Sequence, residues 1–152
     1  MPEKIHLRKV SVIIFYNKRG QILLQARSGD VSKSGEKWGF FGGGIDGDET
    51  PEQAIIREIK EELNYNLKKF TKIGEYENQY FNLKQKNHRK LFRTIFIAPL
   101  NQEIMNSKVI EGDGSKLFNI EETKELKLVP GDEKVIEIFE NYLKNPNRQK
   151  VL

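Results

Sequence analysis

The pattern of apolar and polar residues predicts several strands in the first third of the chain. Residues 7–16 end in the apolar run Val-Ser-Val-Ile-Ile-Phe-Tyr, which is typical of a largely buried strand. A turn signal at residues 17–20 separates this strand from a returning strand at residues 21–27. The polar stretch 28–37 is expected to form a loop, and the aromatic residues at 38–41 predict a short strand after it.

The clearest helical pattern begins after Thr50. Thr50 is suited to cap a helix, Pro51 to occupy its first position and Gln53 to complete a capping box. The helix is expected to run to about Leu63. Apolar residues such as Ile59 recur at helical spacing and predict that one side of this helix packs on the core.

The second half of the chain predicts further strands and a terminal helix. Aromatic and β-branched residues mark the strands, and an apolar stripe at helical spacing marks the helix. Strands combined with separate helices indicate an α/β fold in which helices cover a mixed sheet. The elements expected here are strands at 79–81, 91–100 and 115–118, a basic loop at 84–90, a short helix at 120–126 and a long helix at 130–143.

The composition is typical of one globular domain. The chain has 152 residues, of which 37% are hydrophobic and 32% charged, enough for one core. It has no apolar run long enough to span a bilayer, its charged start does not resemble a signal peptide, and it has no cysteine. We therefore expect a single domain over residues 1–152, cytoplasmic and without a membrane partner. The net charge of +4 is modest, so most lysines are expected to be solvated and a nucleic-acid partner is not expected.

Three glutamates gather on one side of the predicted helix. At about 100° per residue, Glu58, Glu61 and Glu62 lie on an arc beside the apolar arc. Like charges at this spacing destabilise a helix, whereas a bound divalent cation reverses the sign of that effect. Carboxylate oxygens favour hard cations such as Mg2+, Mn2+ or Ca2+. The alternative is an ordinary charged surface helix in which Arg57 forms salt bridges.

The segment from Gly43 to Tyr65 resembles the signature of the Nudix hydrolase family, G-x5-E-x7-R-E-U-x-E-E-x-G-U, where U is a bulky apolar residue. The chain departs at the last two fixed positions, which are Asn64 and Tyr65, and Phe41 stands where many members have Pro. None of these positions supplies a metal ligand, and Asn tolerates the left-handed conformation that follows a helix. The matching residues are Gly43, Glu49, Arg57, Glu58, Ile59, Glu61 and Glu62.

The resemblance implies a metal site and a structural support for it. Family members use the glutamates of this helix to hold a divalent metal against a diphosphate. Glu49 and Arg57 are expected to pair with each other and, with Gly43, to support the loop against the helix. The implied ligands are Glu58, Glu61, Glu62 and the carbonyl of Gly42, with Mg2+ or Mn2+ as the cofactor.

The resemblance also implies a further acidic residue outside this segment. Residues 111–118, Glu-Gly-Asp-Gly-Ser-Lys-Leu-Phe, resemble the family's E-G-x4-W segment, with Leu117 in place of Trp. Glu111 is therefore expected to be a metal ligand or the general base. Glu58 is the competing base, and a solvated turn residue is the alternative for Glu111. The catalytic set expected is Glu58, Glu61, Glu62, Glu111 and Arg57.

Four residues outside the signature are candidates for substrate binding. Arg27 ends a predicted strand where related proteins often carry an arginine that contacts phosphate, and a guanidinium suits bidentate binding. Trp38 and Phe40 are candidates for stacking on a base, although a short aromatic run is more often part of a core. Asp132 begins the last helix, where it is expected to cap the helix or to accept hydrogen bonds from a guanine edge.

The resemblance implies the Nudix α/β/α sandwich and metal-dependent hydrolysis of a nucleoside diphosphate linked to another moiety. The substrates left open are a (d)NTP or oxidised (d)NTP cleaved to NMP and pyrophosphate, a nucleotide sugar and a dinucleoside polyphosphate. Many relatives are homodimers, so a homodimer is left open too. Two other classes are weighed: a Nudix-fold regulatory module, which the intact glutamates disfavour, and a basic nucleic-acid-binding domain, for which no recognition motif is present.

Overall fold

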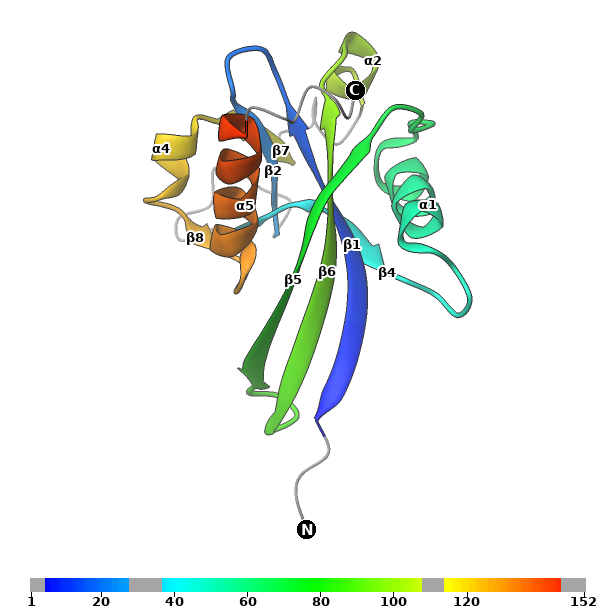
Figure 1. The fold of residues 1–152 in the computed structure, drawn as a ribbon, viewed down its shortest axis with the longest axis vertical. Helices are drawn as coiled ribbons and strands as arrows, with labels where there is room; N and C mark the ends of the chain where they lie inside the picture. Colours follow the sequence, from blue (N-terminus) through cyan, green and yellow to red (C-terminus); the bar gives the residue numbers. More distant parts are fainter. Residues whose placement is uncertain (1–4, 28–36, 108–113, 146–152) are drawn as a thin grey trace.

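A curved mixed sheet runs through the protein (Figure 1). The structure is a computed structural model, and it describes residues 5–27, 37–107 and 114–145. The strands are β1 (His6–Tyr16), β2 (Ile22–Ala26), β3 (Lys37–Gly39), β4 (Phe41–Gly44), β5 (Thr71–Asn82), β6 (Asn87–Pro99), β7 (Ser115–Phe118) and β8 (Lys127–Leu128). The strand order is β5-β6-β1-β2-β3-β8, while β4 pairs with β1 and β7 pairs with β2. β1 and β6 run parallel, and β5 and β6 are antiparallel. The helices are α1 (Pro51–Leu63), α2 (Gln102–Met105), α4 (Ile120–Thr123) and α5 (Asp132–Lys144).

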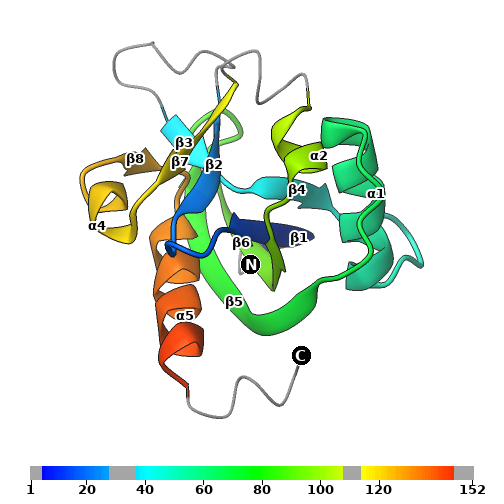
Figure 2. The same ribbon diagram turned by 90° about the horizontal axis from the view of Figure 1, so that it is seen from above.

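Helices cover both faces of the sheet, so each face has its own hydrophobic core. Figure 2 shows α1 and α5 on opposite sides of the central strands. Ile14 of β1 packs in one core with Phe139 of α5, whereas Ile13 packs in the other core with Ile59 of α1. Successive residues of a strand point to opposite faces, which explains the continuous apolar run in β1. The predicted α/β fold, a mixed sheet between helices, is confirmed.

α1 begins and ends as the sequence predicts. The side chain of Thr50 accepts a hydrogen bond from the N–H of Gln53 at 3.1 Å, and the side chain of Gln53 accepts one from the N–H of Thr50 at 2.9 Å. Asn64 follows the helix in the left-handed conformation, with φ 53° and ψ 36°. The capping box and the tolerated glycine replacement are thus confirmed. These caps fix the helical frame that orients the glutamates.

The strands β5 and β6 are longer than the sequence pattern indicates. A strand was predicted only at 79–81, but β5 has 12 residues. The basic loop predicted at 84–90 is partly wrong, because β6 already begins at Asn87. Partly buried and exposed side chains alternate along β5, but the partly buried positions include polar residues that hide the period. α2 and β8 were not predicted, since four and two residues carry no periodicity.

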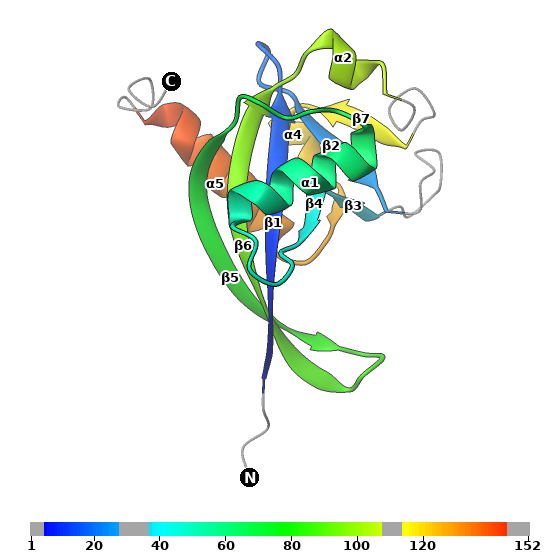
Figure 3. The same ribbon diagram turned by 90° about the vertical axis from the view of Figure 1, so that its right-hand side faces the viewer.

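The outer parts of β1, β5 and β6 extend beyond the helices (Figures 1 and 3). The inner parts of the same strands carry both cores. A long hairpin therefore projects from the body of the protein on one side. Across residues 5–27, 37–107 and 114–145, no helix has the length and apolar character needed to cross a membrane.

Candidate functional site

The glutamates of α1 lie against the glycine-rich strand β4. The N–H of Gly42 donates a hydrogen bond to the carboxylate of Glu62 at 3.0 Å. Glu58 approaches the backbone even more closely, because a Cβ atom on Gly43 would lie 2.4 Å from Cδ of Glu58. Only glycine leaves room for this contact without moving the side chain. Two of the predicted metal ligands therefore sit beside the two predicted glycines.

Arg57 connects the loop before α1 to the glutamates of the helix. Its Nε and Nη2 donate to the two carboxylate oxygens of Glu49 at 2.8 and 2.9 Å, and Nη2 also donates to the carbonyl of Gly44 at 2.9 Å. Its Nη1 donates to Glu58 at 2.9 Å and to Glu61 at 3.4 Å. The hydrogen bonds with Arg57 lower the pKa of Glu49 to about 2, and those with Glu49 raise the pKa of Arg57. The expected pairing of Glu49 with Arg57 is present in bidentate form.

The electrostatics of Glu62 distinguish it from its neighbours. Burial, together with the charges of Glu58 and Glu61, raises the pKa of Glu62 from 4.5 to about 7, although the hydrogen bond from Gly42 and the charge of Arg27 lower it. Glu61 is exposed, with 58% of its side chain accessible. Oxygen donors that disfavour one another's charge fit a hard divalent cation. Within the described part of the chain, no three acidic, cysteine or histidine side chains are grouped so that they could hold a metal ion. Glu58 and Glu61 instead form ion pairs with Arg57.

Two hollows adjoin this group of residues. One, of about 580 Å3, lies at the end of α1 and is lined by Glu61, Glu62 and Glu103 of α2. The other is a smaller cavity of about 160 Å3 beside the glycines of β4. The smaller cavity brings together three of the four predicted substrate-binding residues. Its lining includes Arg8, Arg27, Phe40, Gly42, Gly43, Leu91, Arg93 and Asp132.

Asp132 is held by a buried ion pair and not by a helix cap. Its carboxylate lies 3.4 Å from Nε of Arg93, and the two side chains are 5% and 1% exposed. It also accepts a hydrogen bond from the N–H of Phe40. The N-cap residue of α5 is Gly131, so the prediction that Asp132 caps the helix is wrong. The carboxylate instead points inward, where it lines the smaller cavity.

Arg93 is a functional candidate that the sequence reasoning missed. Its guanidinium donates to the side chain of Asn78 and to the carbonyl of Pro130, and it lies 5.9 Å from the ring centre of Tyr76. A Cβ atom on Gly131, where φ is +95°, would lie 2.5 Å from this guanidinium. The one available signal was an arginine inside the apolar stretch 91–99. A buried charge in a strand requires a partner, which here is the carboxylate described above.

The two aromatic candidates are both buried. Trp38 and Phe40 are 6% and 5% exposed and belong to the same core cluster. The Trp38 ring packs edge-on against Phe118 at 4.8 Å between ring centres, which is the core arrangement weighed against base stacking. Phe40 also lines the smaller cavity, together with Arg27. The attraction of Arg27 lowers the pKa of Asp132, against the larger effect of burial, so these side chains lie within electrostatic reach of each other.

Two further acids concern the site, one of them predicted from the sequence and the other not. Glu111 lies outside the described residues, so its role as ligand or base stays a prediction. Glu103 lines the larger hollow beside Glu61 and Glu62. It was missed because α2 is only four residues long and carries no motif.

Asp132 is expected to make the stability of the protein depend on pH. Burial raises its pKa from 3.8 to about 6, more than the Arg93 charge and the Phe40 N–H lower it. Because the folded pKa lies above the unfolded one, the stability that this group contributes is complete below about pH 4 and is lost as the pH rises through about 6. Denaturant titrations should therefore show that the wild type becomes more stable relative to Asp132→Asn as the pH is lowered from about 7 to about 4. The opposite slope would show that the ion pair with Arg93 outweighs burial.

Comparison with known proteins places this geometry in a family context. The NUDIX domain model matches residues 6–139. The chain is 43% identical over 63 residues to the RNA pyrophosphohydrolase of Marinomonas sp. (strain MWYL1), a match that covers 41% of this chain and 36% of that protein. It is 39% identical over 69 residues to the putative 8-oxo-dGTP diphosphatase of Bacillus subtilis (strain 168), covering 45% and 43%. The matched stretch thus spans less than half the length of these curated relatives. The crystal structure of MutT protein from Methanosarcina mazei Go1 shares the fold, with a TM-score of 0.71 at 19% identity, covering 95% of this chain and 100% of that one.

Proposed function

Since the chain belongs to the NUDIX domain family, whose model matches residues 6–139, we propose that it is a metal-dependent hydrolase of phosphoanhydrides. The proposed substrate is a nucleoside diphosphate linked to another moiety, in particular a (d)NTP or oxidised (d)NTP cleaved to NMP and pyrophosphate. One observation carries the proposal: Glu58 and Glu62 sit against Gly43 and Gly42, next to the cavity that contains Asp132.

The relatives support the reaction class. One is named an RNA pyrophosphohydrolase and the other a putative 8-oxo-dGTP diphosphatase. Both names describe hydrolysis of a diphosphate linkage in a nucleotide or a nucleic acid. The two named substrates, RNA and 8-oxo-dGTP, share a phosphoanhydride linkage and differ in sugar, base and length. The names therefore support the type of bond that is cleaved, whereas the choice of substrate depends on the cavity and its surroundings.

The carboxylates of α1 are proposed to hold a divalent cation, Mg2+ or Mn2+. Glu58, Glu61 and Glu62 would supply carboxylate oxygens and Gly42 its carbonyl. When bound, such an ion neutralises diphosphate charge and lowers the pKa of a bound water. Arg57 pairs with Glu49 in two hydrogen bonds and thereby keeps the helix against the loop that precedes it. The chemistry of the donors suits the ion, since all are oxygens and the charges of Glu58 and Glu61 raise the pKa of the desolvated Glu62. Glu58 and Glu61, which Arg57 holds in this structure, would have to turn toward the ion.

The smaller cavity is proposed to take the nucleoside. Its volume of about 160 Å3 is below the roughly 300 Å3 at which sites for whole drug-sized ligands begin, so it fits only part of a nucleotide. Phe40 contributes an apolar surface, and the Asp132 carboxylate is available to a hydrogen-bond donor on a base edge. Arg27 is proposed to contact phosphate between the cavity and the metal site, which is supported by its place in the cavity lining and by its charge, which lowers the pKa of Glu62. Trp38 is proposed to support this wall from the core.

A substrate screen that identifies both products tests the proposal. We expect hydrolysis of nucleoside triphosphates with Mg2+ or Mn2+, with NMP and pyrophosphate as the product pair and no turnover when the metal is chelated. Nucleotide sugars and dinucleoside polyphosphates are the matched alternatives, because they place the same diphosphate next to another group. Tight nucleotide binding without any phosphate release over hours would instead indicate a regulatory module.

A further inference from the structure

The outer parts of β1, β5 and β6 form an arm that projects past the helices (Figure 3). We call residues 6–9 and 78–92 the arm. The strands remain paired along it, since His6 lies opposite Arg89, and Arg89 lies opposite Tyr80. The arm is therefore a three-stranded sheet with two faces of its own.

The strand register assigns each arm side chain to one face, because side chains alternate along a strand. Cross-strand neighbours share a face, so Tyr80, Arg89 and His6 lie together. Lys90 and Phe81, which are each one residue further along, lie on the opposite face. The first set, which we call the basic face, comprises His6, Arg8, Asn78, Tyr80, Asn82, Asn87, Arg89 and Leu91.

Both faces of the arm carry cations, and residues 6–9 and 78–92 include no acidic residue. Arg8 and Arg89 lie on the basic face, whereas Lys9 and Lys90 lie on the opposite face. The nearest acids of β5, Glu75 and Glu77, have the opposite parity and project from the other face. The basic face therefore combines cations with an aromatic ring and amides, and it has a positive potential suited to an anionic partner.

Two polar atoms of the basic face have no hydrogen-bond partner within the described residues. They are Nε of Arg89 and Oδ1 of Asn87, and both are shielded from solvent. A shielded donor or acceptor costs free energy when it is unpaired, so the hydrogen bonds of the fold do not explain why these two polar groups stand at the tip. Both atoms lie near the tip of the hairpin, away from the cavity.

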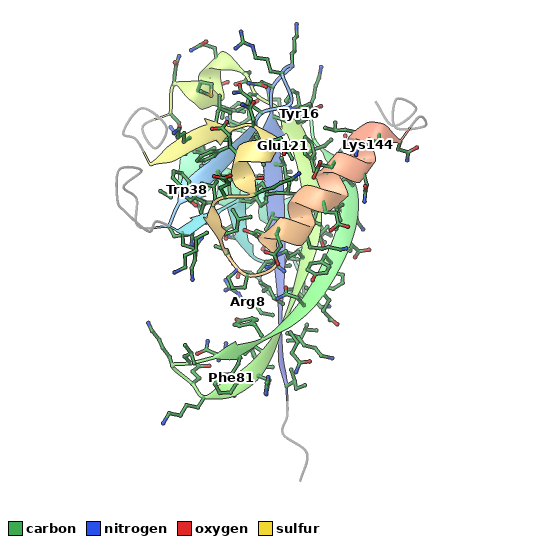
Figure 4. All side chains as sticks on the ribbon, turned by 90° about the vertical axis from the view of Figure 1, so that its left-hand side faces the viewer. Arg8, Tyr16, Trp38, Phe81, Glu121 and Lys144 are labelled. Atoms are coloured by element: carbon green, nitrogen blue, oxygen red, sulfur yellow. The ribbon has the colours of Figure 1, made fainter. Side chains whose placement is uncertain are left out.

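The basic face is continuous with the smaller cavity. Arg8 and Leu91 belong to the basic face and also line the cavity with Asp132. Figure 4 shows Arg8 where the arm leaves the body of the protein. A chain attached to a nucleoside in the cavity would pass Arg8 and then reach Arg89 and Tyr80.

We propose that the basic face of the arm binds single-stranded nucleic acid. The terminal nucleoside of the strand occupies the smaller cavity, and the following nucleotides lie along the arm. The position of the terminal nucleoside rests on the proposed function. The guanidinium groups of Arg8 and Arg89 pair with backbone phosphates. Tyr80 offers a ring on which one base stacks, and the Asn87 amide meets a base edge. Stacking and edge contacts require unpaired bases, so the partner is a single strand and not a duplex.

The double variant Arg89→Gln/Tyr80→Leu tests the basic face. It removes one cation and one ring from a cross-strand pair outside the cavity. The matched control is Lys90→Gln/Phe81→Leu, which also removes one cation and one ring from the same two strands but on the opposite face. Binding of the full chain to fluorescein-labelled single-stranded RNA and DNA is followed by fluorescence anisotropy, and hydrolysis of a nucleoside triphosphate is measured alongside.

We expect Arg89→Gln/Tyr80→Leu to weaken binding of the single strand by about tenfold or more, since one phosphate contact and one stacked base are lost. The slope of log affinity against log salt should decrease in magnitude by about 0.7 for the lost phosphate contact. RNA and DNA should be affected alike, because the lost contacts are to phosphates and base rings. The control variant should bind like the wild type, and both variants should hydrolyse the nucleoside triphosphate at the wild-type rate.

Unchanged affinity of the Arg89 variant, or an equal loss in the control variant, would overturn the proposal. So would a wild-type dimer that dissociates in this variant during sedimentation, because the basic face would then join two copies of the chain. A wild-type protein that hydrolyses nucleoside triphosphates but does not bind the single strand refutes only the role of the arm. Binding that depends on the basic face, without any hydrolysis, refutes the proposed function and leaves the arm in place.

Discussion

Replacing Glu62 by Gln is expected to lower kcat by about 100-fold or more, because the metal site loses a charged ligand. The change keeps the shape of the side chain, and the Gln carbonyl can still accept the hydrogen bond from the Gly42 N–H that Glu62 accepts at 3.0 Å. Only the charge is removed. The same loss is expected for Glu61→Gln, although this side chain is 58% exposed, because its charge reaches the same site. Steady-state kinetics at saturating Mg2+ measure the effect.

Glu52→Gln is the matched control, since Glu52 is an exposed acid in the first turn of the same helix. It should leave kcat unchanged, because it lies away from Gly42 and Gly43. Turnover near the wild-type level in Glu62→Gln would refute the metal assignment. A reduced rate that recovers at higher Mg2+ concentration would show that the substitution weakens metal affinity and leaves the chemical step intact.

The same substitution should raise the thermal stability of the metal-free protein at alkaline pH. The pKa of Glu62 rises from 4.5 to about 7 on folding because of burial, so its contribution to stability is complete below about pH 4.5 and is lost as the pH rises through about 7. Gln has no charge to desolvate. Because the side chain is partly exposed, we expect a gain of roughly 1 kcal/mol, or about 3 °C in Tm, near pH 8 and none near pH 4. A lower Tm for Glu62→Gln near pH 8 would contradict this account.

The opposite effects on activity and stability follow from one physical cause. A desolvated carboxylate beside two other acids costs free energy in the metal-free fold, and a bound cation removes that cost. An acid at such a position is more easily explained by ligand binding than by the needs of the fold. The burial of Glu62 is a property of the folded chain, and a sequence motif does not contain it.

The sequence predicted α1 and its caps because they depend on local contacts. Thr50 and Gln53 interact over three residues, and Asn64 adopts a conformation that only a few residue types tolerate. The pairing of Glu49 with Arg57 spans eight residues and was expected only through the family signature. Such interactions lie within one short segment, so a linear pattern contains them.

The contacts that shape the smaller cavity span much larger separations in sequence. Arg93 and Asp132 are far apart along the chain and meet only because α5 packs on the face of the sheet where β6 presents Arg93. The inward turn of Asp132 then removes it from the capping role that its position at the helix start predicts. The length of the β5–β6 hairpin was underestimated for a related reason. β5 is defined by its pairing with β6 and not by strong strand formers of its own.

Replacing Gly43 by Ala is expected to lower kcat by about 100-fold while the protein stays folded. A Cβ atom at Gly43 would lie 2.4 Å from Cδ of Glu58 and 2.5 and 2.7 Å from its two oxygens. The clash is with the end of a flexible side chain, so Glu58 rotates away and the backbone keeps its path. The loss therefore falls on the position of the carboxylate, where a shift of about 1 Å is enough for an effect of this size. Steady-state kinetics and thermal melting together distinguish displacement from unfolding.

Gly44→Ala is the matched control, because a Cβ atom there would meet Nη2 of Arg8 at an ordinary contact distance of 3.5 Å. It should keep kcat within about threefold and should melt like the wild type. In Gly43→Ala, a second change of Glu58 to Asp shortens the side chain and clears the new methyl group, so part of the activity should return in a double-mutant cycle. If Gly43→Ala retains full turnover with an unchanged Tm, the close contact between Glu58 and Gly43 is not required for catalysis. If Gly43→Ala unfolds, the clash with Glu58 has displaced the backbone, and Gly43 is required for the stability of the fold.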